Sequence, residues 1–176
     1  MDVALLIIRV IAGLLFAGHG AQKLFGWFGG HGLKGTGGFF EETLGLTPGR
    51  VHAGAAGFNE FAGGLLLAFG LLTPVAAALI IATMTAAVFT VHLKNGPWAA
   101  NNGWELNVLY GLIGFAVAGI GAGDISLDNA LGLDIAGIGW AIAALVAGVV
   151  GGLTVVAAGR ANTRRASNAP GAVVAQ

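Results

Sequence analysis

The sequence contains no cysteine and little charge: among 176 residues, 8 are Lys or Arg and 8 are Asp or Glu, so the net charge is zero. The lack of cysteine excludes disulfides, thiolate nucleophiles, iron–sulfur ligation and c-type haem attachment by this chain. A redox function would therefore need a bound ligand or the groups of a partner. Outside the C-terminal tail no basic cluster is interleaved with aromatic residues, so we expect no nucleic-acid partner.

Apolar residues take the place of the missing charge. The sequence is 56% hydrophobic and 9% charged, whereas soluble domains have about 25% charged residues, and its mean hydropathy is +0.85. A helix needs about 20 apolar residues to cross a bilayer. Five runs are long enough, at residues 3–24, 53–72, 75–93, 104–122 and 135–158. The sequence predicts an all-α, polytopic transmembrane helical bundle whose direct partner is the lipid bilayer.

Positive and negative charges fall on different connections between these runs. With five spans, one side carries Lys23, Lys34, Arg50, Lys94, Arg160, Arg164 and Arg165, and the other carries Asp124, Asp128 and Asp134. Positive loops lie in the cytoplasm, so we expect the N-terminus outside and the C-terminus in the cytoplasm. We call the positive side the inner end and the acidic side the outer end. The first run begins with an acidic residue and contains Arg9, which indicates an uncleaved span rather than a signal peptide.

Several polar side chains lie deep within the apolar runs. With a rise of about 1.5 Å per residue, Glu60 lies about 10 Å inside one end of its run, too deep for a short carboxylate to reach the surface. His19 lies at a similar depth, about 7 to 8 Å from the inner end of the first run. We therefore expect an inner cluster of polar groups: His19, Lys23, Asn59, Glu60, His92 and Glu105.

This cluster allows several chemistries. His19 and Glu60 could form a proton relay that serves a quinone or another small redox ligand. A metal site is less well supported because no HxxxH or ExxH spacing occurs, and a b-type haem between His19 and His92 rests only on their depth. The remaining interpretation is an ion-paired core that fixes the register of the helices without chemistry.

Arg9 lies near the outer end of the first run. It is about 9 Å deep by the helical rise, a distance that an arginine side chain can largely cover by extending toward the surface. Its functional interpretation is a partnership with Asp124 or Asp128, in which the segment around Ser126 folds back over the mouth of the bundle.

An ordered series of motifs carries a resemblance to a known family. It comprises Arg9-x3-Gly13-x4-Gly18-His19-Gly20-x2-Lys23, then FFEETLGLTP, Glu60 followed by GGLLLAFGLLT, Trp104-Glu105 and GAGDISLDNAL. In this order and spacing, residues 5–131 resemble the DoxX family of small bacterial membrane proteins. The family's recurrent polar positions match Arg9, His19, Lys23, Glu60, Glu105, Ser126 and Asp128. In GAGDISLD the chain departs from the family pattern, because Ala122 replaces a proline and Asp124 replaces a frequent basic residue.

The resemblance implies a helical bundle in the bacterial inner (plasma) membrane with a role in redox or oxidative-stress chemistry. We expect a DoxX-like bundle at residues 1–131, commonly of four spans, an additional transmembrane helix at 132–159 and a disordered cytoplasmic tail at 160–176. Glu60 and His19 are the candidate proton-transfer residues, and Arg9, Lys23, Asn59, His92, Glu105, Ser126 and Asp128 are candidate binding residues. A quinone is the candidate ligand, membrane or peripheral redox proteins are candidate partners, and self-association stays open. The alternative is a non-catalytic scaffold or partner-binding subunit with a structural polar core.

Overall fold

The computed structural model describes residues 2–168, and these residues form helices and connecting loops without a strand. Apolar runs that are interrupted by Gly, Pro and polar clusters produce this pattern, because those residues end helices. The α-helices are α1 (Asp2–Phe25), α2 (Gly32–Glu42), α3 (Gly49–Phe69), α4 (Thr73–Ala87), α5 (Glu105–Ile120), α6 (Leu127–Ala130) and α7 (Ile138–Ser167). A π-helical turn, Val88–His92, continues α4. The predicted all-α helical bundle is confirmed.

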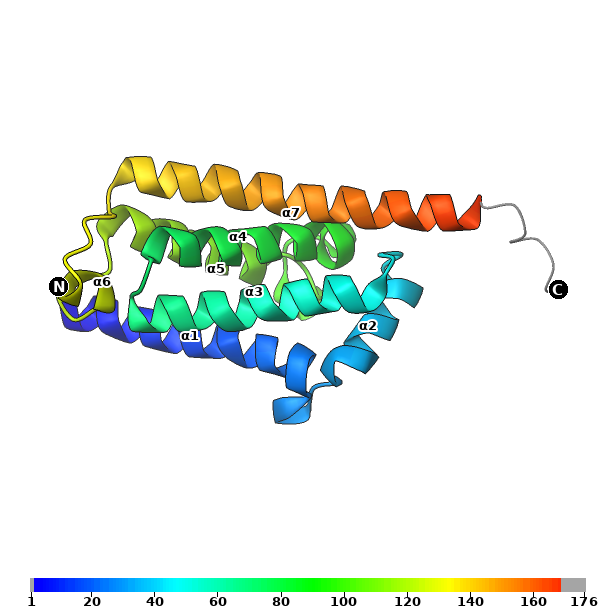
Figure 1. The fold of residues 1–176 in the computed structure, drawn as a ribbon, viewed down its shortest axis with the longest axis horizontal. Coiled ribbons are helices and arrows are strands. Elements are labelled where there is room, and N and C mark those ends of the chain that lie inside the picture. The colour runs from blue at the N-terminus through cyan, green and yellow to red at the C-terminus, as the bar shows by residue number, and fades with distance from the viewer. Residues whose placement is uncertain (1, 169–176) are drawn as a thin grey trace.

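Five of these helices, α1, α3, α4, α5 and α7, run along the long axis of the molecule (Figure 1). They occupy the positions of the five apolar runs. Among the residues that the structure describes, three helical segments could cross a membrane by length and composition: Asp2–Phe25, Thr73–Asn95 and Ile138–Arg165. Helix α5 is apolar but shorter, and α3 contains Asn59 and Glu60. Successive long helices alternate in direction, so the N-terminus and the end of α7 lie at opposite ends (Figure 1).

Glycine allows α1 and α3 to pack with their backbones in contact. A methyl group on Gly64 would collide with the Ala17 nitrogen and the Gly13 carbonyl oxygen, and one on Gly20 would collide with the backbone of Gly57 and Phe61. Small residues at helix interfaces permit such close approach. This contact fixes the register of α1 along α3 and so sets which of their polar groups meet.

Helix α7 packs on α4 in a similar way. A ladder of small residues, Ala144, Gly148 and Gly152, forms the contact, since a methyl group on Gly148 would collide with Ile81 and one on Gly152 with Ala82. Helix α7 continues to Ser167, so residues 160–167, which we expected in the tail, are helical. The rest of the predicted tail, residues 169–176, lies outside the described residues.

Helix α2 crosses the inner end of the bundle (Figure 1). The connection between the first two apolar runs folds into this helix, which begins at Gly32. The Glu41 carboxylate accepts a hydrogen bond from the Gly49 nitrogen at 2.9 Å. This bond ties the end of α2 to the start of α3.

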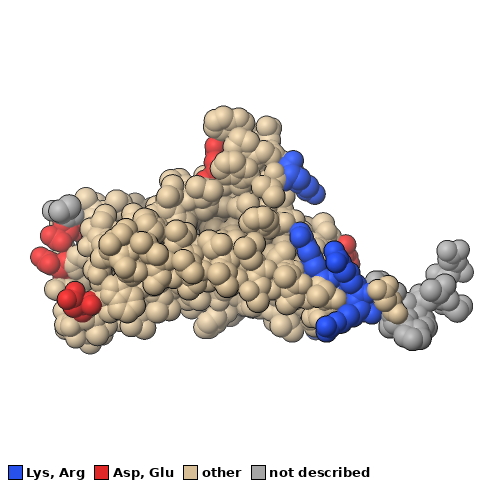
Figure 2. Space-filling view, turned by 90° about the horizontal axis from the view of Figure 1, so that it is seen from above, with Lys and Arg blue, Asp and Glu red and all other residues tan. Residues whose placement is uncertain are grey.

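The long helices expose apolar side chains on the lateral surface of the bundle, as Ile7, Ile11 and Leu14 on α1 illustrate. Extended apolar surfaces of this kind mark contact with a membrane or a protein. The charges gather toward the two ends instead: the end near the N-terminus carries carboxylates, and most of the lysines and arginines lie toward the end of α7, where further carboxylates accompany them (Figure 2). The fold therefore has an apolar belt between two polar ends.

The contact between α1 and α3 predicts unequal effects of two glycine-to-alanine changes. Gly64→Ala is expected to destabilise the protein by about 1–3 kcal/mol, because the added methyl group overpacks the interface. Gly18→Ala on α1 is the control, since an added methyl group there has no atom within 4 Å. Thermal unfolding in detergent measures both variants. Equal melting temperatures for the two would contradict the packing described here.

Candidate functional site

An ion pair joins α1 to α3 near their inner ends. The Lys23 nitrogen Nζ lies 2.6 Å from Oε2 of Glu60, with 26% of the lysine and 5% of the glutamate side chain exposed. Helix α3 holds Glu60 inside the bundle, while the longer side chain of Lys23 reaches it from the edge of α1. A short carboxylate at this depth needs a partner, and Lys23 provides it.

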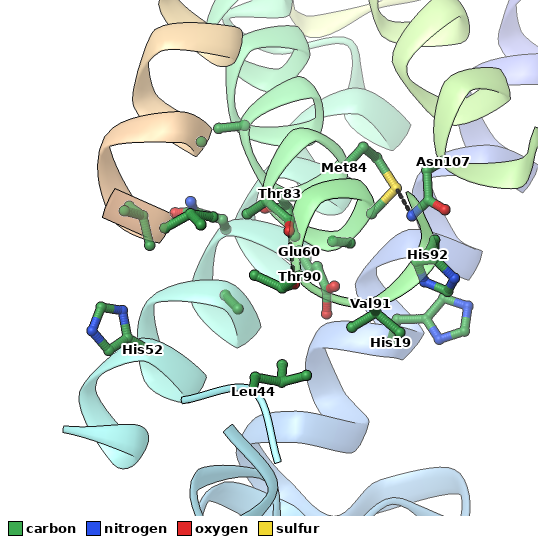
Figure 3. A pocket seen from close by; sticks show the side chains of 18 of the residues that line it. His19, Leu44, His52, Glu60, Thr83, Met84, Thr90, Val91, His92 and Asn107 are labelled. Atoms are coloured by element: carbon green, nitrogen blue, oxygen red, sulfur yellow. Dashed lines mark hydrogen bonds between the residues drawn. The ribbon is translucent and has the colours of Figure 1, made fainter. Parts of the chain in front are cut away.

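Glu60 faces a cavity of about 540 Å³ at the inner end of the bundle. The cavity is mainly apolar, with walls from α1, α3, the end of α4, α5 and α7, and a floor from α2 and the loop after it. Figure 3 shows Glu60, His19, His92 and Asn107 arranged around this hollow from separate segments of the chain. A largely apolar pocket of this size with a few convergent polar groups is typical of a small-molecule site.

His19 lines this cavity from α1, and its side chain is exposed. Its Nδ1 atom lies 3.1 Å from Oε1 of Gln22, and Nε2 of Gln22 donates to the Phe28 carbonyl at 3.2 Å. Because the amide oxygen of Gln22 can only accept, this network assigns the proton to Nδ1 of His19. Nε2 of the neutral ring then carries the lone pair that can take up a proton.

His92 has an equivalent arrangement on the π-helical turn. Its Nδ1 atom lies 2.7 Å from the carbonyl oxygen of Asn102, which must accept the hydrogen bond, so the free lone pair is again on Nε2. Single π-helical turns are frequent at functional sites because they re-aim side chains out of the regular helical register. Here the turn directs Thr90, Val91 and His92 to the cavity.

The structure brings five of the six expected inner residues together, since His19, Lys23, Asn59, Glu60 and His92 all line the cavity. Glu105 is the exception. Its carboxylate accepts a hydrogen bond from the Ala99 nitrogen at 2.8 Å and so fixes the loop before α5. The N–H of Ala99, at the start of the short helical turn Ala99–Asn101, accounts for this position, because backbone N–H groups at the start of a turn need an acceptor.

Sequence reasoning missed several residues that bring polar or sulfur atoms to the cavity: His52, Thr83, Met84, Thr90, Asn107 and Tyr110. Asn107 is buried, and its Nδ2 atom lies 3.4 Å from the sulfur of Met84. The ring of Tyr110 packs on Phe16, with 5.4 Å between centroids. An amide within an apolar run was the only signal in the sequence that could have revealed Asn107.

The outer end of the bundle is closed around Arg9, which is fully buried. Its guanidinium donates to the carbonyl oxygens of Ala68 at 3.4 Å and Ile125 at 2.5 Å. Gly70 ends α3 with φ of +61°, and a methyl group there would collide with Arg9 and Ser126. Arg9 thus satisfies a C-terminal carbonyl of α3, where a positive charge is favourable.

Asp128 caps the start of α4. Its carboxylate accepts hydrogen bonds from the nitrogens of Leu72 at 2.7 Å and Thr73 at 3.1 Å, and from the Thr73 hydroxyl at 2.5 Å. Ser126 caps α6 by accepting from the Asn129 nitrogen at 3.2 Å. The segment around Ser126 does fold back over the mouth. Within the described residues, no hydrogen bond joins Arg9 to Asp128, but their opposite charges attract each other. Arg9 donates to the carbonyl oxygens of Ala68 and Ile125, and Asp128 binds the start of α4.

Within residues 2–168, no group of three or more His, Asp or Glu side chains is placed to hold a metal ion. The geometry of the inner cavity instead offers one buried carboxylate with a lysine partner, together with two imidazole lone pairs. Such a set can bind a small ligand with polar edges and can exchange protons with it.

The chain matches a family model and is similar to known proteins. The family model described as DoxX matches residues 4–93, a region that contains Arg9, His19, Lys23, Glu60 and His92. The chain is 33% identical over 118 residues to the Bacillus subtilis (strain 168) protein named "Putative oxidoreductase CatD", covering 67% of this chain and 81% of that protein.

A second relative comes from Haemophilus influenzae (strain ATCC 51907 / DSM 11121 / KW20 / Rd) and is named "Uncharacterized protein". It is 35% identical over 105 residues, which are 55% of this chain and 78% of that protein. No solved structure matches the chain.

The closed outer end predicts that Asp128 supports folding. Asp128→Asn is expected to lower the stability by about 1.5–3 kcal/mol, because hydrogen bonds to a charged acceptor contribute that much. Asp124→Asn is the matched control, since Asp124 is exposed in the same segment. Thermal unfolding of the purified proteins is the measurement. If Asp128→Asn melts at the temperature of the control, the carboxylate does not hold the α3–α4 turn.

Proposed function

Because the chain belongs to the DoxX family and is a membrane protein, we propose that it acts in a membrane redox or oxidative-stress system and that its inner cavity binds a quinone. The name of its Bacillus subtilis relative, "Putative oxidoreductase CatD", supports this assignment. The observation that carries the proposal is the buried Glu60 carboxylate, paired with Lys23, in the wall of a mainly apolar cavity of about 540 Å³.

A quinone matches both properties of this cavity. Its ring is flat and apolar, and its two carbonyl oxygens accept hydrogen bonds and, on reduction, protons. Reduction to the quinol consumes two electrons and two protons. In this proposal the electrons come from a membrane or peripheral redox partner, and the side chains of this chain bind the ring and supply the protons.

The exposure of the polar groups suggests the order in which they handle protons. Glu60 is buried and faces the cavity, so it is the group that meets the ligand. His19 lines the same cavity but is exposed, so its Nε2 atom is the group that exchanges protons with water at the inner surface. Lys23 holds Glu60 in position and stabilises its charge.

Glu60→Gln keeps the shape of the side chain but cannot carry a proton to the ligand. We expect the variant to accumulate and to bind a quinone, but to reduce the bound quinone about 100-fold or more slowly, the usual size of a general acid–base contribution. The measurement is voltammetry of purified protein on an electrode, which supplies the electrons in place of the partner. Glu42→Gln is the control, because Glu42 is exposed on α2. Unchanged reduction rates in Glu60→Gln would refute the proton-transfer role.

A scaffold role, in which the ion pair only joins α1 to α3, makes a different prediction. Apolar residues of similar volume often replace a buried ion pair without loss of stability. The double variant Lys23→Met, Glu60→Leu is therefore expected to fold under either hypothesis. If Glu60 transfers protons, the variant no longer protects cells against quinone stress; if the pair is only a scaffold, the variant protects them fully. Immunoblots of membranes establish that the protein is present.

We also propose that the protein lies in the bacterial inner membrane, with its N-terminus outside and its C-terminus in the cytoplasm. The gathering of lysines and arginines toward the end of α7 supports this orientation (Figure 2). A phosphatase that is active only outside the cytoplasm should be active when inserted between Asp124 and Asp134 and inactive when fused after Gln176. The reverse pattern, or activity at both sites, would contradict the proposed topology.

A further inference from the structure

A second hollow lies beside the inner cavity, between α4, α5 and α7. It has a volume of about 380 Å³, and its wall is almost entirely apolar. We call it the apolar groove. Side chains characteristic of its wall are Val88, Phe89, Val108, Leu112, Phe115 and Leu145. Unlike the cavity, it offers almost no polar group to orient a ligand, so it suits a hydrocarbon chain.

Only two side chains line both the groove and the cavity, Met84 and Asn107. They form the partition between the two hollows, in which Nδ2 of Asn107 lies 3.4 Å from the sulfur of Met84. A thioether is a weak acceptor, and methionine side chains adapt their shape easily. A modest change in one side chain would therefore join the two spaces.

The π-helical turn after α4 contributes wall residues to both hollows. Val88 and Phe89, at its start, line the groove, whereas Thr90, Val91 and His92 line the cavity. A regular helix would distribute these neighbours differently, since π-helical turns change the direction of the side chains that follow. The irregular turn thus provides walls to both spaces.

The direction of the groove matches an amphiphile in a bilayer. Helix α5 begins at the inner end, and the groove follows it from Asn107 to Phe115, a rise of about 12 Å toward the middle of the helix bundle. A ligand with its head in the cavity and its tail in the groove would have the head near the inner surface and the tail toward the membrane centre.

We propose that the apolar groove holds the hydrocarbon tail of the quinone whose head occupies the cavity, so that the ligand is a tailed, membrane-dissolved quinone that enters from the bilayer past Met84 and Asn107. This inference rests on the proposed function and narrows the class of ligand. The wall of Met84 and Asn107 that the groove shares with the cavity is what selects this occupant over a separate lipid chain.

The test compares two quinones with the same head, 2,3-dimethoxy-5-methyl-1,4-benzoquinone and its 6-decyl derivative, on full-length protein in nanodiscs. Gly111 lies in the groove, and a Cβ there meets only Ile81, at 4.0 Å. Gly111→Phe therefore fills the groove without a backbone collision. We expect it to weaken binding of the decyl quinone by roughly tenfold, the usual effect of lost apolar contacts in a pocket, and to leave binding of the tailless quinone unchanged.

Gly139→Phe is the control, because an added Cβ at Gly139 has no atom within 4 Å and this residue lies in the first turn of α7. Val108→Trp is a second groove-filling variant, at an exposed position, in case Gly111→Phe does not fold. Melting temperatures establish that each variant is intact before its binding is compared.

The outcomes separate the inference from the proposed function. Loss of decyl-quinone binding alone supports the tail site. Unchanged binding of both quinones in the groove variants, or a loss of co-purified phospholipid without an effect on the decyl quinone, would overturn it while the head site stands. If the wild-type protein binds neither quinone, the proposed function itself is wrong.

Discussion

The ion pair between Lys23 and Glu60 is the interaction on which the inner half of the molecule depends. It can form because glycine lets α1 and α3 touch along their backbones, which fixes the register of one helix against the other. Glu60 is thereby held in the wall of an apolar cavity, where an unpaired charge would be costly. The same pair therefore joins α1 to α3 and places a reactive group.

The two ends of the bundle differ in how they use their polar side chains. At the outer end, Arg9 donates to the carbonyl oxygens of Ala68 and Ile125, and Asp128 accepts from the start of α4, so both side chains help to close the mouth. At the inner end, the imidazoles of His19 and His92 each keep a free lone pair on Nε2. The polar groups of the outer end are thus structural, because they bind the backbone of loops and helix ends, whereas the imidazoles of the inner end stay available for chemistry.

Composition and depth along the apolar runs predicted the all-α bundle and most of the inner cluster, because a bilayer imposes strict rules on helix length and on buried charge. They could not predict that Glu105 binds a loop nitrogen or that Asp128 caps α4, since both depend on how connections fold back on helix ends. The π-helical turn at Val88–His92 and the partition formed by Met84 and Asn107 could not be predicted either, because tertiary packing rather than hydropathy determines them.

The central claim of this account is that the inner cavity holds a quinone. Protein purified in mild detergent from native membranes can be extracted with organic solvent and its quinone content measured against the protein. Quinone should be present in near-stoichiometric amounts in the wild type and be lost from a cavity-filling variant such as Thr83→Trp, provided that the variant is folded. Quinone at the background level of the detergent extract in both proteins would contradict the claim.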